Sequence, residues 1–124
     1  MKKSEANILI IDDEVLICEV LQTGLKDEGL KTRSFQQAKK GLQEFHNNHY
    51  DFVISDIQMP DMNGMDLLKH IKQTDPNVPI LLISAFSDHT QQAAKKLGAL
   101  DILAKPIDID YVIDVIKNNL QIQD

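Results

Sequence analysis

The most constraining feature of the sequence is an abrupt change from aliphatic to acidic residues near the N-terminus. Residues 8–11 are Ile-Leu-Ile-Ile, and the next three residues are Asp-Asp-Glu. A β-branched run of this kind favours a strand buried on both faces, and a carboxylate cannot remain in such a core without a partner. The same change occurs at residues 52–56, Phe-Val-Ile-Ser-Asp. If the two strands are parallel neighbours, Asp12, Asp13 and Asp56 converge at one edge of a sheet.

Apolar patterns along the chain predict five strands that alternate with five helices. We expect strands at residues 8–11, 30–35, 52–55, 80–84 and 100–104. We expect helices at residues 15–28, 36–48 and 65–74, a fourth one ending at 97, and a fifth from 108 to about 120. Alternation of this kind implies one α/β domain with a parallel sheet covered by helices on both faces, and its core spans about residues 7–120.

Local signals add detail to three of these elements. The strand at 30–35 is less apolar than the others, so we expect it near a sheet edge. Ser87 or Asp88 is expected to cap the fourth helix. Helical spacing in the first helix predicts one apolar stripe, formed by Ile17, Val20, Leu21 and Leu25.

Composition excludes several classes of protein. The chain has 124 residues, with 19 acidic side chains against 13 lysines and arginines, a net charge of −6. That balance argues against direct binding of nucleic acid, which needs a basic surface. The lone cysteine, Cys18, can form no internal disulfide, as in a reducing compartment. There is no signal-peptide pattern and no apolar run near the length of about 18 residues that a membrane span needs. We therefore expect a cytoplasmic protein without membrane contact.

The ends of the predicted strands carry a chemically coherent set of side chains. In an open parallel sheet, ligands bind beyond the carboxyl ends of the strands. Those ends carry Asp12 and Asp13, Asp56, Ser84 and Lys105. Carboxylates hold Mg²⁺, and a carboxylate can itself attack phosphorus to give an acyl phosphate. A hydroxyl and an ammonium group would neutralise the phosphoryl oxygens. The set therefore suits transfer of a phosphoryl group to an aspartate.

Four separate segments carry recognisable motifs, in a fixed order along the chain. They are Asp12-Asp13, Asp56-x-x-Met59-Pro60-x-Met62-x-Gly64, Ser84-Ala85 and Lys105-Pro106. With these motifs the chain resembles, over almost its whole length, the receiver domain of two-component response regulators. The resemblance implies a flavodoxin-like (βα)5 fold with a five-stranded parallel sheet of order 2-1-3-4-5.

The resemblance also implies roles for single residues. Asp56 would accept a phosphoryl group from a histidine kinase or a histidine phosphotransfer protein. Ser84 and Lys105 would contact the phosphoryl oxygens, and the Lys105–Pro106 bond would be cis. Such a receiver is a signalling module that catalyses only its own phosphorylation and dephosphorylation.

A metal ion belongs to the same expectation. By resemblance, Mg²⁺, with Mn²⁺ as a substitute, would be bound by Asp13, Asp56 and the backbone carbonyl of Gln58. Asp12 would act on the ion largely through water. Met59, Met62 and Met65 are expected to fill gaps in the packing around this loop.

One position departs from the family pattern. Many receivers carry Tyr or Phe three residues before the lysine, and its rotation reports phosphorylation, whereas this chain has Ile102. A receiver that hands its phosphoryl group on loses least by this change. Residues 97–110 are similar to stand-alone intermediates of sporulation phosphorelays, and the tail at 121–124 is too short for an output domain. We therefore expect onward transfer to a phosphotransfer protein or another partner.

The first helix carries more apolar residues than core packing requires. Leu16, Ile17 and Val20 broaden its apolar stripe, and the helix begins at the acidic edge. Two interpretations remain open: part of the stripe docks a kinase or phosphotransfer partner, together with the Lys105–Pro106 loop, or the stripe is simple core. We expect the chain itself to be a monomer.

Three other functions compete with the receiver. A phosphorylation-independent binding module would not need the acids, the hydroxyl and the lysine together. A phosphohydrolase with an aspartyl nucleophile usually places a second acid two residues later, where this chain has Gln58. A flavodoxin needs a phosphate-binding loop after the first strand, where the three acids would repel phosphate unless a cation intervened.

Overall fold

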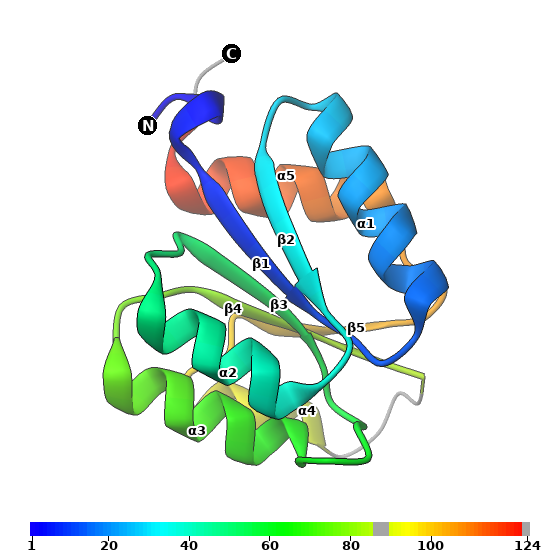
Figure 1. Cartoon of the computed structure of the whole chain (residues 1–124), viewed down its shortest axis with the longest axis vertical. Coiled ribbons are helices and arrows are strands. Elements are labelled where there is room, and N and C mark those ends of the chain that lie inside the picture. The colour runs from blue at the N-terminus through cyan, green and yellow to red at the C-terminus, as the bar shows by residue number, and fades with distance from the viewer. Residues whose placement is uncertain (86–89, 123–124) are drawn as a thin grey trace.

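The computed structural model describes residues 1–85 and 90–122 and shows one layered α/β domain (Figure 1). Its elements in chain order are a 3₁₀ helix η1 (Lys3–Glu5), β1 (Asn7–Ile11), α1 (Val15–Asp27), β2 (Lys31–Phe35), α2 (Ala38–Asn47), β3 (Phe52–Asp56), α3 (Gly64–Thr74), β4 (Ile80–Ser84), α4 (Thr90–Lys96), β5 (Asp101–Ala104) and α5 (Ile109–Leu120). All neighbouring strands are parallel, and their order is β2-β1-β3-β4-β5. The predicted flavodoxin-like topology is confirmed.

Alternating side chains of the central strands build two cores, one on each face of the sheet. Ile8 and Ile10 face α1 and α5, whereas Leu9 and Ile11 face α2, α3 and α4. All four side chains are fully buried, because side chains alternate along a strand and helices cover both faces. Burial on both faces of the sheet explains why the sequence of this strand is continuously aliphatic.

Most predicted elements are confirmed, with shifts at their ends. α2 begins at Ala38 rather than residue 36, because Gln37 has extended backbone angles (φ −125°, ψ 135°). β2 is the edge strand, as expected from its composition. α5 begins as predicted, since the Asp108 side chain accepts hydrogen bonds from two amides of the first turn. The predicted caps of α4, Ser87 and Asp88, lie outside the described residues.

The predicted core stripe of α1 needs one correction. Val20 is 49% exposed, whereas Cys18, Leu21 and Leu25 are buried. Ile17 is partly buried against the core shared with α5. Residues 18, 21 and 25 lie on one face at helical spacing, and Val20 points away from it. Among the described helices, none is both long and apolar enough to cross a membrane.

Gly64, the first residue of α3, permits a very close approach to β3. Its N–H donates to the carbonyl oxygen of Ile57 at 2.7 Å. A Cβ atom at this position would lie 2.5 Å from Ile57 Cα and 2.7 Å from Ile57 O. Backbone atoms cannot yield as a flexible side chain can, so glycine is required to close the loop between β3 and α3.

We expect Gly64→Ala to lower the free energy of unfolding by about 1–3 kcal/mol, because the added methyl group overpacks the loop base. Urea denaturation followed by circular dichroism measures this change. Lys69→Ala, at an exposed position of the same helix, is the matched control and should change stability by about 0.5 kcal/mol or less. Equal urea midpoints for Gly64→Ala and the wild type would show that a methyl group fits between residue 64 and Ile57.

Candidate functional site

The register of the sheet brings the acidic residues together. Ile11 of β1 lies opposite Ser55 of β3, so the residues that follow, Asp12 and Asp56, are neighbours at the carboxyl edge of the sheet. Asp12 is fully buried, Asp56 is 3% exposed and Asp13 is exposed. One carboxylate oxygen from each of these three residues lies within 4.8 Å of the others. The convergence predicted from the sequence is confirmed.

A single lysine lies among the acids. Lys105, the first residue after β5, places its Nζ 3.1 Å from Glu14 Oε1, 3.3 Å from Asp12 Oδ2 and 3.5 Å from Asp56 Oδ2. The Lys105–Pro106 peptide bond is cis, as the resemblance implied. One ammonium group is therefore shared by three carboxylates.

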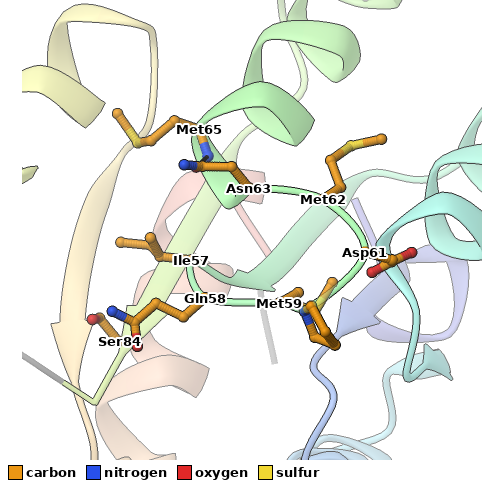
Figure 2. A pocket seen from close by; sticks show the side chains of 9 residues that line it. Ile57, Gln58, Met59, Asp61, Met62, Asn63, Met65 and Ser84 are labelled. Atoms are coloured by element: carbon orange, nitrogen blue, oxygen red, sulfur yellow. Dashed lines mark hydrogen bonds between the residues drawn. The ribbon is translucent and has the colours of Figure 1, made fainter.

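Beside the acids lies an open cavity of about 790 Å³. Gln58 and Ser84 line it, with the loop between β3 and α3 forming much of its wall (Figure 2). Ser84, the last residue of β4, is 3% exposed. Met59, Met62 and Met65 also line the cavity while packing against the core of α2 and α3, so the predicted packing role is confirmed. The lining includes Ile57 and Gln58, which directly follow Asp56 in the chain, but none of Asp12, Asp13 and Asp56.

Burial and mutual repulsion change the pKa values of these groups. Burial, followed by the charge of Asp12, raises the pKa of Asp56 to about 6. Burial also raises the pKa of Asp12, although the Glu14 amide and Lys105 oppose it. For Lys105, burial works to lower the pKa, but the hydrogen bond to Glu14 and the charges of Asp12 and Asp56 outweigh it and raise the pKa. The single positive charge of Lys105 thus does not balance the negative charges of the surrounding acids, and the lysine itself remains charged.

One oxygen of this cluster lacks a hydrogen-bond donor. Asp12 Oδ1 accepts from the Glu14 N–H at 2.8 Å. Asp12 Oδ2 is buried and accepts no well-aligned hydrogen bond from any residue that the structure describes, although Lys105 Nζ lies 3.3 Å away. A buried carboxylate oxygen that has an ion pair with Lys105 but no well-aligned hydrogen bond, among further carboxylates, fits a hard divalent cation such as Mg²⁺. The residues present therefore suit the predicted metal.

The predicted fourth ligand lies in the loop after β3. Gln58 follows Asp56 by two residues, and its N–H donates to Asp56 Oδ1 at 3.3 Å. This contact places the Gln58 backbone beside Asp56, the residue with which its carbonyl was expected to bind Mg²⁺.

Two residues of this region were not given a role from the sequence. Glu14 contacts Lys105, and Asp61 accepts hydrogen bonds from the N–H groups of Ala38 (3.1 Å) and Lys39 (3.0 Å). The sequence held one indication of such a cap: Gln37 stands just before α2, where a side chain that caps the helix is usual, and glutamine is not a common capping residue. No local pattern could show which distant acid would supply the cap.

The remaining candidate ligands lie outside the acidic cluster. Cys18 is buried, its thiol donates to the Asp12 carbonyl oxygen at 3.3 Å, and it is not a member of the three-acid group. His46, His49 and His70 are exposed. Among the described residues, the three-acid cluster is the one group of at least three acidic, His or Cys side chains close enough to hold a metal ion.

We expect Asp56→Asn to stabilise the protein at pH 7 without divalent cations. The pKa of Asp56 in the folded chain is raised from 3.8 to about 6. Between these two pH values the unfolded chain therefore binds fewer protons than the folded chain does. This contribution to the free energy of unfolding therefore falls as the pH rises from about 4 to about 6. The gain at pH 7 should be about 1–3 kcal/mol and should shrink towards pH 4.

Urea denaturation over this pH range in a chelating buffer measures the effect. Asp13→Asn, at the exposed acid of the cluster, is the control and should stabilise less. An Asp56→Asn variant no more stable than the wild type at pH 7 would contradict the raised pKa.

Comparisons with known proteins agree with this geometry. The family model of the response regulator receiver domain matches residues 8–117. The DNA-binding transcriptional regulator NtrC of Proteus hauseri is 37% identical over 114 residues, which cover 91% of this chain and 24% of that protein. The transcriptional regulatory protein ZraR of Klebsiella oxytoca is 35% identical over 111 residues, which cover 89% of this chain and 25% of that protein. The chain thus spans about a quarter of the length of these curated relatives.

Solved structures show the same similarity. A response regulator receiver domain protein from Clostridium thermocellum is 31% identical, with a TM-score of 0.88 and 94% of each chain covered. The receiver domain of the Francisella response regulator 1452 is 27% identical, with a TM-score of 0.87, covering 94% of this chain and 97% of that one. On the match over residues 8–117, the sheet order and the acidic edge, this chain belongs to the response regulator receiver domain family of two-component signalling systems.

Proposed function

We propose that this chain accepts a phosphoryl group on Asp56, in a Mg²⁺-dependent reaction, from a phosphohistidine of a histidine kinase or a phosphotransfer protein. The observation that carries the proposal is the placement of Asp56. Its carboxylate lies at the end of β3 between two other acids and the Lys105 ammonium group, beside an open cavity. A structural acid would not need such neighbours.

The chemistry is a nucleophilic displacement at phosphorus. An Asp56 carboxylate oxygen forms a bond to phosphorus, the bond from phosphorus to the donor imidazole nitrogen breaks, and that nitrogen keeps the electron pair and takes up a proton. The attacking carboxylate must be ionised, which the raised pKa opposes and the charge of Lys105 favours. When bound, the metal ion supplies positive charge that favours the ionised acids and the developing negative charge on the phosphoryl oxygens.

Two further side chains suit the product. Lys105 Nζ lies 3.5 Å from Asp56 Oδ2, within reach of a phosphoryl group attached to Asp56. Ser84 lines the same cavity as Gln58 and can donate its hydroxyl to a phosphoryl oxygen. Gln58 itself offers no acid at the position that a phosphohydrolase uses for proton donation. The chain would therefore catalyse only its own phosphorylation and dephosphorylation, and we place this reaction in the cytoplasm.

Onward transfer to a phosphotransfer protein or another partner is the second part of the proposal. The position that carries an aromatic ring in many receivers is Ile102, a partly buried side chain packed against the core of α3 and α4. An aliphatic side chain cannot report phosphorylation by turning a ring inward. This favours a receiver that passes the phosphoryl group on.

Docking of the partner is proposed on α1 and the Lys105–Pro106 loop. Val15, Leu16 and Val20 are 56%, 73% and 49% exposed, an apolar surface beside the acidic edge. Exposed apolar side chains gathered on one helix are typical of a protein contact. Ile17 is partly buried in the core, so Leu16 and Val20 are the better contacts among the three residues of the predicted docking stripe.

The first test is intact-mass spectrometry after incubation with acetyl phosphate. We expect the wild type to gain one phosphoryl group in the presence of Mg²⁺ and to remain unmodified in a chelating buffer. Asp56→Asn should gain none under either condition, because the amide cannot form the acyl phosphate. Asp13→Asn is the informative companion, since it removes a proposed ligand and keeps the acceptor, and it should slow the gain.

A wild type that takes up no phosphoryl group from acetyl phosphate with Mg²⁺ would overturn the proposal. Its replacement would be a phosphorylation-independent binding module, to be tested with partner pull-downs.

The docking surface is tested with Val20→Asp. Because Val20 is half-exposed, circular dichroism should show an intact fold, and loading from acetyl phosphate should be unchanged. Transfer from a phosphorylated histidine phosphotransfer domain that loads the wild type should fall on the order of tenfold, as for a central contact residue. Thr23→Asp, at an exposed polar position of α1, is the matched control. Unfolding of Val20→Asp, or equal transfer rates in both variants, would contradict docking through Val20.

A further inference from the structure

Helix α2 receives its N-terminal cap from a distant loop. Asp61 Oδ1 accepts from the Ala38 N–H at 3.1 Å, and Asp61 Oδ2 accepts from the Lys39 N–H at 3.0 Å. The residue before the helix, Gln37, forms no side-chain cap. The first amides of a helix have no partner within the helix, and a capping side chain usually comes from the residue just before it. Here the carboxylate comes from the loop between β3 and α3.

The same loop is held at its base. The Gly64 N–H donates to Ile57 O at 2.7 Å, and no space exists there for a Cβ atom. Asp61 therefore provides a second attachment, on the other side of the loop. The segment between the two attachments contains Gln58, whose N–H donates to Asp56 Oδ1.

Helix α2 is in turn seated firmly on β1. A Cβ atom on Gly41 would come within 2.6 Å of Ile11 Cδ1, so the α2 backbone packs directly against the Ile11 side chain. Ile11 directly precedes Asp12, which lies in the acidic cluster. The end of β1 and the loop after β3 thus both contact α2. The contact of β1 is between Ile11 and Gly41, and the loop is attached through Asp61.

We propose that Asp61 is a positioning residue, which fixes the β3–α3 loop to α2 and thereby holds the Gln58 backbone carbonyl in place to bind Mg²⁺. This inference rests on the proposed Mg²⁺-dependent function and on the expectation from the family resemblance that Asp56 and the Gln58 carbonyl bind the same ion. Asp61 acts through the loop and touches neither the ion nor the phosphoryl group. Its two oxygens are already engaged by α2, and its hydrogen bonds lower its pKa, the bond from Lys39 most of all.

The test separates loop positioning from helix capping. In the full chain, Asp61→Ala removes both, whereas Gln37→Ser combined with Asp61→Ala returns a local cap to α2 without reconnecting the loop. Asp108→Ala is the matched control. It also removes a helix cap, but the cap of α5 comes from the residue just before that helix and not from the β3–α3 loop. Asp61→Asn keeps the side-chain volume and one acceptor oxygen, so it can be measured even if the alanine variant folds poorly.

The readouts are the Mg²⁺ dissociation constant, from an NMR shift titration of unphosphorylated protein, and the urea midpoint. We expect Asp61→Ala to weaken Mg²⁺ binding on the order of tenfold, as removal of an outer support of a metal site commonly does. Asp61→Asn should weaken it less. Gln37→Ser should return stability to the alanine variant but not Mg²⁺ affinity, and Asp108→Ala should lose stability with Mg²⁺ affinity unchanged.

Several results would overturn the inference. Wild-type Mg²⁺ affinity in Asp61→Ala would do so, as would recovery of affinity along with stability in the Gln37→Ser double variant, or an equal loss of affinity in Asp108→Ala. Acetyl phosphate loading of the wild type distinguishes the two proposals. If the wild type takes up phosphate while Asp61→Ala binds Mg²⁺ normally, Asp61 is only a cap and the proposed function stands. If the wild type binds Mg²⁺ but takes up no phosphate, the proposed function fails and the Mg²⁺ titration still decides the role of Asp61.

Discussion

Two buried carboxylates, Asp12 and Asp56, depend on a single ammonium group, that of Lys105, and the rest of the molecule is arranged to bring these three groups together. Each comes from the end of a different strand. Only a parallel sheet places those ends at one edge, and only helices on both faces exclude water from the strands that lead there. The charge balance at this edge remains incomplete, since burial raises the pKa of both acids.

Incomplete neutralisation of the buried acids lowers the stability of the folded chain and favours binding of a cation. Burying like charges side by side destabilises the folded chain above the pKa of Asp56, about 6. The same excess of negative charge is what attracts a cation, and a cation that binds only the folded chain stabilises it in return. Strongly perturbed pKa values are common at functional sites, and the acidic cluster has the geometry to hold such a cation.

The loop between β3 and α3 shows how backbone geometry supports this chemistry. Gly64 closes the loop against Ile57, and the loop also lines the open cavity beside Ser84. Asp61 ties the loop to the start of α2, while Gly41 seats that helix on β1. Local contacts of this kind lie outside the acidic cluster, and they attach the loop that follows Asp56 to α2 and to the end of β3.

Sequence patterns were sufficient to predict the class of fold and the members of the acidic cluster. Aliphatic runs that stop at acids mark the ends of buried strands, and alternation with helices makes the sheet parallel, so Asp12, Asp13, Asp56, Ser84 and Lys105 could be assigned to one edge. Local signals also sufficed for the start of α5 at Asp108 and for the edge position of β2.

The pairing of groups from distant segments could not be predicted from sequence patterns and became visible in the folded chain. The exposure of Val20, the contact of Glu14 with Lys105 and the cap that Asp61 provides to α2 depend on contacts between segments far apart in sequence, or on the direction in which a helix face is turned. Periodicity places a residue on a face of its own element to within about one position, but it does not say what lies opposite. Hydrogen bonds and charges act over a few ångströms, so their partners are fixed by packing and not by local pattern.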